Sequence, residues 1–220
     1  MIKENLENVR RRIEAACRRS ARDTGSVRLV AVTKEAEVGQ IIEALNLGVT
    51  EIGENRVKNA LFKKDLLDGH IFTLHMIGHL QSNKAGQAVR LFSVIHSVDS
   101  LKLAFTIDRE AKKAGKTQDI LVEVNVSGEE SKFGIRPEEL DKFLEDAGRL
   151  KHLSVKGLMT MAPFNEEAEK ARPYFRRLKE LASSRALAEL SMGMTQDFEV
   201  AVEEGATMVR VGRAIFGGKK

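Results

Sequence analysis

The sequence is poor in aromatic side chains: it has no tryptophan, one tyrosine, and only 5% Phe, Trp and Tyr among 220 residues. A core built from this composition depends on Leu, Ile, Val, Ala and Met. No apolar run approaches the roughly 20 residues needed to cross a bilayer. The first 20 residues also lack the apolar segment of a secretory signal. We therefore expect a globular protein that neither spans a membrane nor is exported.

Cysteine is almost absent, because Cys17 is the only one in the chain. A single cysteine excludes an intrachain disulfide, which is typical of proteins in a reducing cytoplasm. Cys17 shares a helical stripe with Leu6, Val9 and Ile13. We predict a cytoplasmic protein in which this thiol is buried and inert, since no neighbouring group suggests thiolate activation.

The chain has no large excess of charge, because 36 basic and 32 acidic residues leave a net charge of +4. Six arginines do cluster near the amino terminus, at positions 10, 11, 12, 18, 19 and 22. Such a cluster on a helix is usually a solvated face, and a nucleic-acid-binding arm is the alternative. The aromatic residues that stack on bases are missing beside it, so we expect no nucleic-acid partner.

Several motifs that carry chemistry are also missing. There is no GxxxxGK phosphate loop, no GxGxxG fingerprint, and no HExxH, CxxC or GxSxG sequence. His75 and His79 have a zinc-ligand spacing only if they lie on a helix, whereas the surrounding pattern is that of a strand. We expect no metal site.

The chain repeats one pattern, in which short apolar runs alternate with helical segments. Residues 2–23 form an amphipathic pattern that ends at Thr24-Gly25. Eight strand candidates follow, at residues 27–33, 50–53, 72–78, 93–98, 119–126, 153–159, 186–192 and 207–212. Several are apolar at successive positions, as expected of parallel strands that are covered on both faces.

Helical patterns separate these strands, for example at residues 38–48, 100–115 and 138–148, and glycines at 48, 115, 148 and 205 follow helical segments. Eight β-α units without a linker predict an α/β fold: a single (β/α)8 TIM barrel over residues 1–220, with an extra amino-terminal helix. A doubly wound open sheet is the alternative. It would normally have fewer strands or a switch-point fingerprint.

In such a barrel, active chemistry lies at the carboxyl ends of the strands. The residues at these positions are Lys34, Glu54-Asn55, Gly78-His79, Val98-Asp99, 125–128, Met159-Thr160, 191–194 and 210–213. They are rich in potential ligands for a small anionic molecule.

Lys34 directly follows the first apolar run. It is either a surface charge that begins a loop or a reactive amine, because a partly desolvated lysine is pushed toward the neutral form that attacks aldehydes. A Schiff base with a phosphorylated aldehyde cofactor requires two further features: a phosphate cradle, and a partner for the ring nitrogen.

The last two units contain candidates for both features. Ser191 offers a hydroxyl, Gly193 permits close backbone approach, and Gly212 with the N–H of Arg213 could face the same phosphate. Helix capping by Ser191 and Thr195, and a tight turn at Gly212, are the structural alternatives. Arg210 interrupts an apolar strand, so it needs a partner. That partner is either a buried carboxylate or a ligand.

At these residues the sequence resembles the YggS/PROSC family of pyridoxal phosphate homeostasis proteins, also called PLP-binding proteins. The resemblance runs almost from end to end. Its segments are AVTK (31–34), EIGENRV (51–57), HMIGHLQSNK (75–84), IHSVDS (95–100), VNVSGEESKFG (124–134), GLMTM (157–161), LSMGMTQDFEVAVEEGAT (190–207) and VRVGRAIFG (209–217).

The family is similar in fold to the barrel domain of bacterial alanine racemase. The resemblance implies that Lys34 forms a Schiff base with pyridoxal 5'-phosphate (PLP), and that Arg210 faces the pyridine nitrogen. It implies Ser191, Gly193, Gly212 and Arg213 around the phosphate. Asn55 and His79 match family positions near the cofactor. Helix capping by Asn55, and packing of His79 on Gly78, remain the alternatives.

The implied function is intracellular PLP homeostasis and delivery, with a role in amino-acid balance. The resemblance implies PLP-requiring apoenzymes as recipients, and we expect a monomer. A permanent positive charge beside the pyridine nitrogen opposes its protonation, which argues against transamination. A weak PLP-dependent racemase is the alternative, but the second base that racemases need is not evident. Tyr174 falls in the helix after the sixth strand, and the chain ends at Lys220, soon after the eighth.

Overall fold

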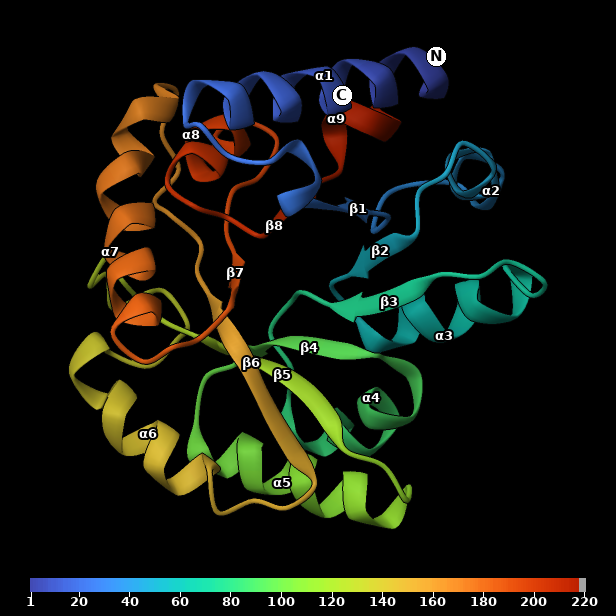
Figure 1. Cartoon of the computed structure of the whole chain (residues 1–220). Coiled ribbons are helices and arrows are strands. Elements are labelled where there is room, and N and C mark those ends of the chain that lie inside the picture. The colour runs from blue at the N-terminus through green and yellow to red at the C-terminus, as the bar shows by residue number, and fades with distance from the viewer. Residues whose placement is uncertain (218–220) are drawn as a thin grey trace.

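The fold is a closed barrel of eight parallel strands surrounded by helices (Figure 1). The computed structural model describes residues 1–217. Neighbouring strands in the chain pair with one another, and the barrel closes between the first and the eighth, where Val30 aligns with Arg210. The strands are β1 (Arg28–Val32), β2 (Glu51–Glu54), β3 (Thr73–Met76), β4 (Val94–Val98), β5 (Gln118–Glu123), β6 (Leu153–Met159), β7 (Glu189–Ser191) and β8 (Met208–Val211). The predicted TIM barrel is confirmed.

The α-helices form the outer layer. They are α1 (Ile2–Arg19), α2 (Val38–Asn46), α3 (Val57–Leu66), α4 (Ala85–Leu91), α5 (Leu101–Lys113), α6 (Leu140–Ala147), α7 (Arg172–Ser183), α8 (Phe198–Glu203) and α9 (Arg213–Phe216). Short 3-10 helices occur at η1 (Thr24–Ser26), η2 (Ser82–Lys84), η3 (Pro137–Glu139) and η4 (Ala168–Ala171). Gly48, Gly115 and Gly205 follow α2, α5 and α8 with positive φ, which is the left-handed conformation that glycine adopts most readily.

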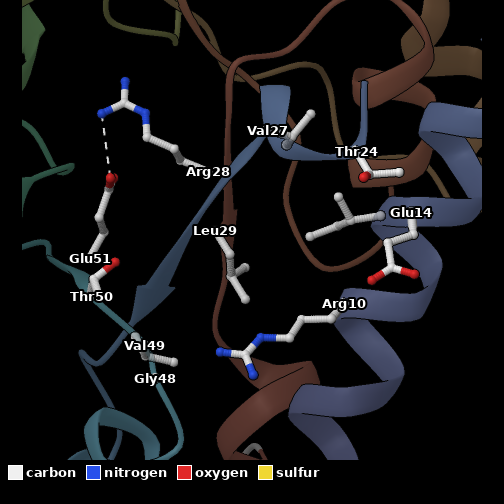
Figure 2. A pocket seen from close by; sticks show the side chains of 11 residues that line it. Arg10, Glu14, Thr24, Val27, Arg28, Leu29, Gly48, Val49, Thr50 and Glu51 are labelled. Carbon is white, nitrogen blue, oxygen red and sulfur yellow. Dashed lines mark hydrogen bonds and ion pairs between the residues drawn. The ribbon is translucent and has the colours of Figure 1, made fainter. Parts of the chain in front are cut away.

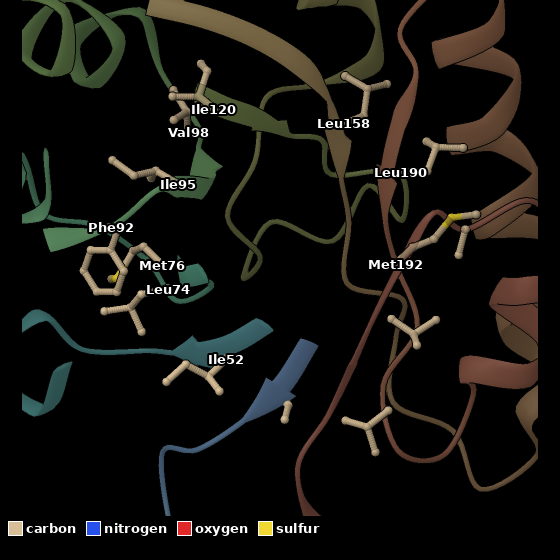
Figure 3. Packing of buried hydrophobic residues seen from close by; sticks show 14 of the residues in the cluster. Ile52, Leu74, Met76, Phe92, Ile95, Val98, Ile120, Leu158, Leu190 and Met192 are labelled. Carbon is tan, nitrogen blue, oxygen red and sulfur yellow. The ribbon is translucent and has the colours of Figure 1, made fainter. Parts of the chain in front are cut away.

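Apolar side chains are divided between two places, because successive residues of a strand point to opposite faces. The large cluster fills the layer between strands and helices, where Ile52, Leu74, Ile95 and Leu190 project from their strands (Figure 3). The small cluster contains Val30, Leu121, Met159 and Met208. The arginine, glutamate and histidine residues described below leave this second cluster little room, so polar contacts also contribute to the barrel interior.

Helix α1 packs against α8 and α9, across the outer layer where the barrel closes (Figure 1). Its buried stripe contains Leu6, Val9, Ile13 and Cys17, so the predicted burial of the thiol is confirmed. Burial raises the pKa of Cys17, which keeps the thiol protonated.

The amino-terminal arginines attach α1 and the following turn to the rest of the protein. Arg12 lies 2.7 Å from Glu199, and Arg19 lies 2.6 Å from Glu203. Arg22 donates to the carbonyls of Val202 and Ala206. These arginines bind carboxylates and backbone carbonyls of the same chain, so the cluster has a structural role.

Some predicted boundaries were wrong. Helix α1 ends at Arg19, not at residue 23, because Ala21 adopts a left-handed conformation with φ 53° and turns the chain. Strand β7 has three residues, not seven, because Ala186 also has φ 53° and cannot continue a strand. In the chain up to Gly217, no helix is both long and apolar enough to cross a membrane.

Candidate functional site

A cavity of about 360 Å³ opens at the carboxyl ends of the strands. It contains Lys34, Asn55, Arg210, Gly212 and Arg213, five of the eight residues predicted from the sequence. The other lining residues are Val32, Ile77, Gly78, Met161, Ala162, Pro163, Phe164, Asn165, Met194, Thr195, Gln196 and Asp197. Segments from both ends of the chain therefore meet around one small-molecule-sized cavity.

Lys34 lies just beyond β1, where the strand leaves the barrel. Its side chain is 46% exposed, and its Nζ is 3.6 Å from Glu35 Oε1. The desolvation expected from its position is therefore partial. The amine is reachable from the cavity and is not held by a buried partner.

The turn that carries Lys34 is held by a buried ion pair. Lys63 donates to the carbonyl of Thr33 and, at 2.7 Å, to Oε1 of Glu54. The Thr33 hydroxyl donates to the same Glu54 oxygen at 2.7 Å. Glu54 is 1% exposed, and its second oxygen has no hydrogen-bond partner in the described structure. The pair therefore connects the ends of β1 and β2, next to Lys34.

Arg210 is buried at 4% exposure and is held by uncharged groups. Its Nη1 donates to Ser191 Oγ at 2.6 Å, and its Nη2 donates to the carbonyl of Thr160 at 2.9 Å. Among ion pairs within residues 1–217, none involves Arg210. Burial lowers its pKa to about 10, against the opposing effects of Asp197 and Glu123. The guanidinium is therefore charged at neutral pH and faces a cavity without a carboxylate bonded to it.

Two carboxyl groups close to Arg210 are unusually easy to protonate. Burial raises the pKa of Glu123 to about 7, the charge of Asp99 adds to this effect, and Arg210 opposes it. Burial also raises the pKa of Asp197, although this carboxylate accepts the backbone N–H of Met194 at 2.6 Å. Near neutral pH, Glu123 is thus a group that can hold or release a proton.

Ser191 and Gly193 do not line the cavity. Ser191 is fully buried, and its hydroxyl lies between Arg210 and His96. Gly193 has φ 88°, and a Cβ there would lie 2.5 Å from the Cβ of Ala201 and 2.9 Å from the Cα of Phe198. The structure thus gives Gly193 a packing role, which allows α8 to approach β7.

Gly212 and Arg213 do line the cavity, after β8. A Cβ on Gly212 would lie 3.0 Å from the carbonyl oxygen of Val32. The absence of a side chain therefore keeps the end of β8 close to the end of β1, and brings the cationic Arg213 near Lys34.

Asn55 and His79 differ in position. Asn55 lines the cavity and also an adjoining cleft of about 580 Å³, whereas His79 lines only the cleft. The His79 ring stacks on Phe133 with 3.9 Å between centroids, and its Nδ1 is 3.2 Å from Asp99 Oδ2. His79 therefore links the β3 and β4 ends to the loop after β5.

Known proteins resemble this chain along its whole length. The family described as alanine racemase, N-terminal domain, matches residues 4–220. A pyridoxal phosphate homeostasis protein of Aquifex aeolicus is 43% identical over 223 residues, which cover 99% of this chain and 98% of that protein. The chain belongs to the pyridoxal phosphate homeostasis protein family. The predicted resemblance, including that to the alanine racemase barrel, is confirmed.

Solved structures have the same fold. A crystal structure of a protein from Bifidobacterium adolescentis matches with a TM-score of 0.91 at 38% identity, covering 98% of this chain and 94% of that one. PipY of Synechococcus elongatus, in a structure with PLP bound, matches with a TM-score of 0.85 at 35% identity, covering 99% and 100%.

In this family member the sequence reasoning missed part of the cavity wall. Phe164 and Asn165 come from the loop after β6, which has no apolar period and no charged motif to identify it. Thr195 and Asp197 lie on the loop after β7, where helix capping by Thr195 was one of the two alternatives. The one sequence signal for these residues was their position directly after a strand, where barrel loops line the cavity.

Proposed function

We propose that this chain binds PLP in the cavity at the strand ends, holds it as a reversible Schiff base on Lys34, and acts in cytoplasmic PLP homeostasis and delivery. The observation that carries the proposal is the meeting of Lys34, Arg210 and Arg213 around one small cavity. Membership of the family supports it, as does the PLP-bound structure of the similar PipY.

The donor set fits PLP. When bound, PLP supplies an aldehyde that condenses with an amine and releases water, together with a phosphate and a pyridine nitrogen. Lys34 is the amine of the cavity. The phosphate would lie between the loop of Thr195 and the Gly212-Arg213 turn, where backbone N–H groups and a guanidinium favour an anion. Ser191 would act indirectly, by holding Arg210.

Arg210 would face the pyridine nitrogen, as the family resemblance implies. Its charge opposes ring protonation, which weakens the ring as an electron sink. Its partners, a hydroxyl and a carbonyl, leave this charge unneutralised. We therefore propose that the protein stores and releases PLP and does not carry out rapid amino-acid chemistry. A free amino acid or the lysine of a PLP-requiring apoenzyme would be the acceptor, and the protein would act as a monomer.

Weak racemase activity is the second candidate, because the family match includes alanine racemase and Glu123 can exchange protons near pH 7. The chain's one tyrosine, Tyr174, lies on α7, packs against the outer core and does not line the cavity. We expect exchange of the Cα hydrogen of added amino acids with solvent to be slow. Rapid exchange with loss of stereochemistry would favour the racemase.

Lys34→Ala tests the proposal directly. The wild-type protein incubated with PLP and reduced with borohydride should carry a phosphopyridoxyl group on the peptide containing Lys34. Lys34→Ala should lose both this label and the visible absorbance of the bound cofactor. Lys58→Ala is the matched control, since this exposed lysine borders the adjoining cleft and should leave labelling unchanged. Labelling that persists in Lys34→Ala would refute the assignment.

A further inference from the structure

A chain of buried polar groups crosses the barrel interior from the cavity toward its opposite end. His75, His96 and Ser191 are each 0% exposed. Ser191 Oγ is 2.9 Å from His96 Nδ1, and His96 Nε2 is 2.8 Å from His75 Nδ1. The two rings meet edge to face. These residues come from β3, β4 and β7, so barrel closure alone brings them together.

The two ends of this chain carry opposite charges. At the cavity end, Arg210 donates to Ser191 Oγ at 2.6 Å. At the other end, the buried atoms His75 Nε2 and Glu51 Oε2 lie 3.3 Å apart, and within the described residues neither has a hydrogen-bond partner. Figure 2 shows Glu51 pointing toward Arg28. Their side chains lie 3.4 Å apart and line a second cavity of about 270 Å³ at the amino-terminal ends of β1 and β2. Arg28 also contacts Glu189 at 2.6 Å.

The charged groups at the two ends determine which atom donates in each hydrogen bond between them. Burial raises the pKa of Glu51, but the contact with the His75 ring and the charge of Arg28 outweigh this effect and lower it, so Glu51 is an ionised acceptor. A hydrogen on His75 Nε2 suits this neighbour, and with one hydrogen on the ring, Nδ1 is an acceptor that faces His96 Nε2. His96 then donates from Nε2 and accepts at Nδ1. The Ser191 hydroxyl supplies that hydrogen, and its oxygen remains free to accept from Arg210.

The reverse order conflicts with both ends. A lone pair on His75 Nε2 would face the Glu51 carboxylate. Ser191 Oγ would accept from both His96 and Arg210, and its own hydrogen would lose its acceptor in the chain. Burial lowers the pKa of His96 well below its usual range, and the charges of Arg210 and Arg28 lower it further, so a doubly protonated His96 does not resolve the conflict.

We propose that Glu51, His75 and His96 are positioning residues for Arg210, acting through a one-way chain in which Arg210 donates to Ser191, Ser191 to His96 and His96 to His75, and in which the Nε2–H of His75 faces the Glu51 carboxylate. The chain keeps the Ser191 oxygen available to Arg210, and so holds the guanidinium toward the cavity. The proton order is independent of the cofactor. Its consequence for PLP rests on the proposed function.

The test is nitrogen NMR of the cofactor-free protein labelled with ¹⁵N-histidine. We expect both His75 and His96 to be neutral and protonated on Nε2, with unprotonated Nδ1. Assignment uses His75→Gln and His96→Gln. A wild-type spectrum in which either ring is protonated on Nδ1 would overturn the proposal, whatever the variants do.

Glu51→Gln removes the fixed acceptor, because an amide can turn either its oxygen or its nitrogen toward His75. Both rings should then show a mixture of tautomers, whereas the conservative Glu51→Asp should preserve the wild-type state. Glu189→Gln is the matched control, since it alters the other partner of Arg28 without touching the chain. Unchanged tautomers in Glu51→Gln would also overturn the proposal.

PLP binding supplies the second readout. Losing one oriented hydrogen bond to Arg210 should raise the dissociation constant about fivefold in Glu51→Gln, with Glu51→Asp and Glu189→Gln close to wild type. Equal affinity in all three variants would show that the chain does not position Arg210. Failure of the proposed function is distinguishable, because it appears as absent PLP labelling of Lys34 in the wild-type protein.

Discussion

Replacing Lys63 with methionine should destabilise the protein strongly, because it leaves a carboxylate buried without its cation. Glu54 is 1% exposed and Lys63 is 11% exposed, so neither is well solvated. The Glu54 carboxylate would keep only the Thr33 hydroxyl as a partner. Removing one member of such a pair typically costs about 3–5 kcal/mol. This loss is a large part of the stability of an ordinary domain.

Urea denaturation measures this cost. With a denaturant dependence of about 3 kcal/mol per molar, the midpoint of Lys63→Met should fall by about 1–1.7 M. Lys64→Met is the matched control, since Lys64 is an exposed neighbour on α3 and its replacement should change stability by less than about 0.5 kcal/mol.

The double variant Glu54→Gln/Lys63→Met separates buried charge from lost packing. Removing the carboxylate charge as well should restore part of the stability, with a coupling of about 1–3 kcal/mol. A double variant no more stable than Lys63→Met would refute the argument. Since Lys63 also holds the carbonyl of Thr33, borohydride labelling of Lys34 should be slower in Lys63→Met than in Lys64→Met.

Two further predictions follow from the residues around the cavity. The pKa of Glu123 is raised to about 7, so between pH 4.5 and 7 the folded protein binds a proton that the unfolded chain has lost. The stability that this proton confers is lost as the pH rises through 7. Glu123→Gln has no such proton to lose. Urea titrations should show that its free energy of unfolding, minus that of the wild type, rises by about 3 kcal/mol from pH 4.5 to 8. A difference that stays constant with pH would contradict the assigned pKa. Gly78→Ala places a Cβ 2.5 Å from the carbonyl oxygen and 2.8 Å from the Cα of Asn55, so it should cost about 1–3 kcal/mol and weaken PLP binding. Gly39→Ala is its control, because a Cβ there meets nothing within 4 Å, and its stability should be unchanged or slightly higher. Equal stability of the two variants would show that the Asn55 backbone moves aside without cost.

Local sequence patterns determined the barrel, because each β-α unit carries its own signal. A strand such as β5 is a run of apolar residues, and a helix such as α5 repeats them every three to four positions before a glycine stop. The same local reasoning places Lys34 and Arg210 near the carboxyl ends of strands, and parallel strands bring those ends to one face. The barrel and the positions of these two residues could be predicted without knowing the contacts between units.

The orientation of individual polar side chains was decided only by the tertiary structure. Ser191 was expected near the phosphate because its hydroxyl lies at the end of a strand and the family resemblance implies that role. In the closed barrel this hydroxyl lies between Arg210 and His96. His96 and Ser191 are separated by 95 positions, and no local pattern records the register that makes them neighbours. The sequence by itself thus determined the eight units and the face where lysine and arginine meet, whereas barrel closure decided which polar groups face the cavity and which are buried, because burial depends on strands that are distant in the chain.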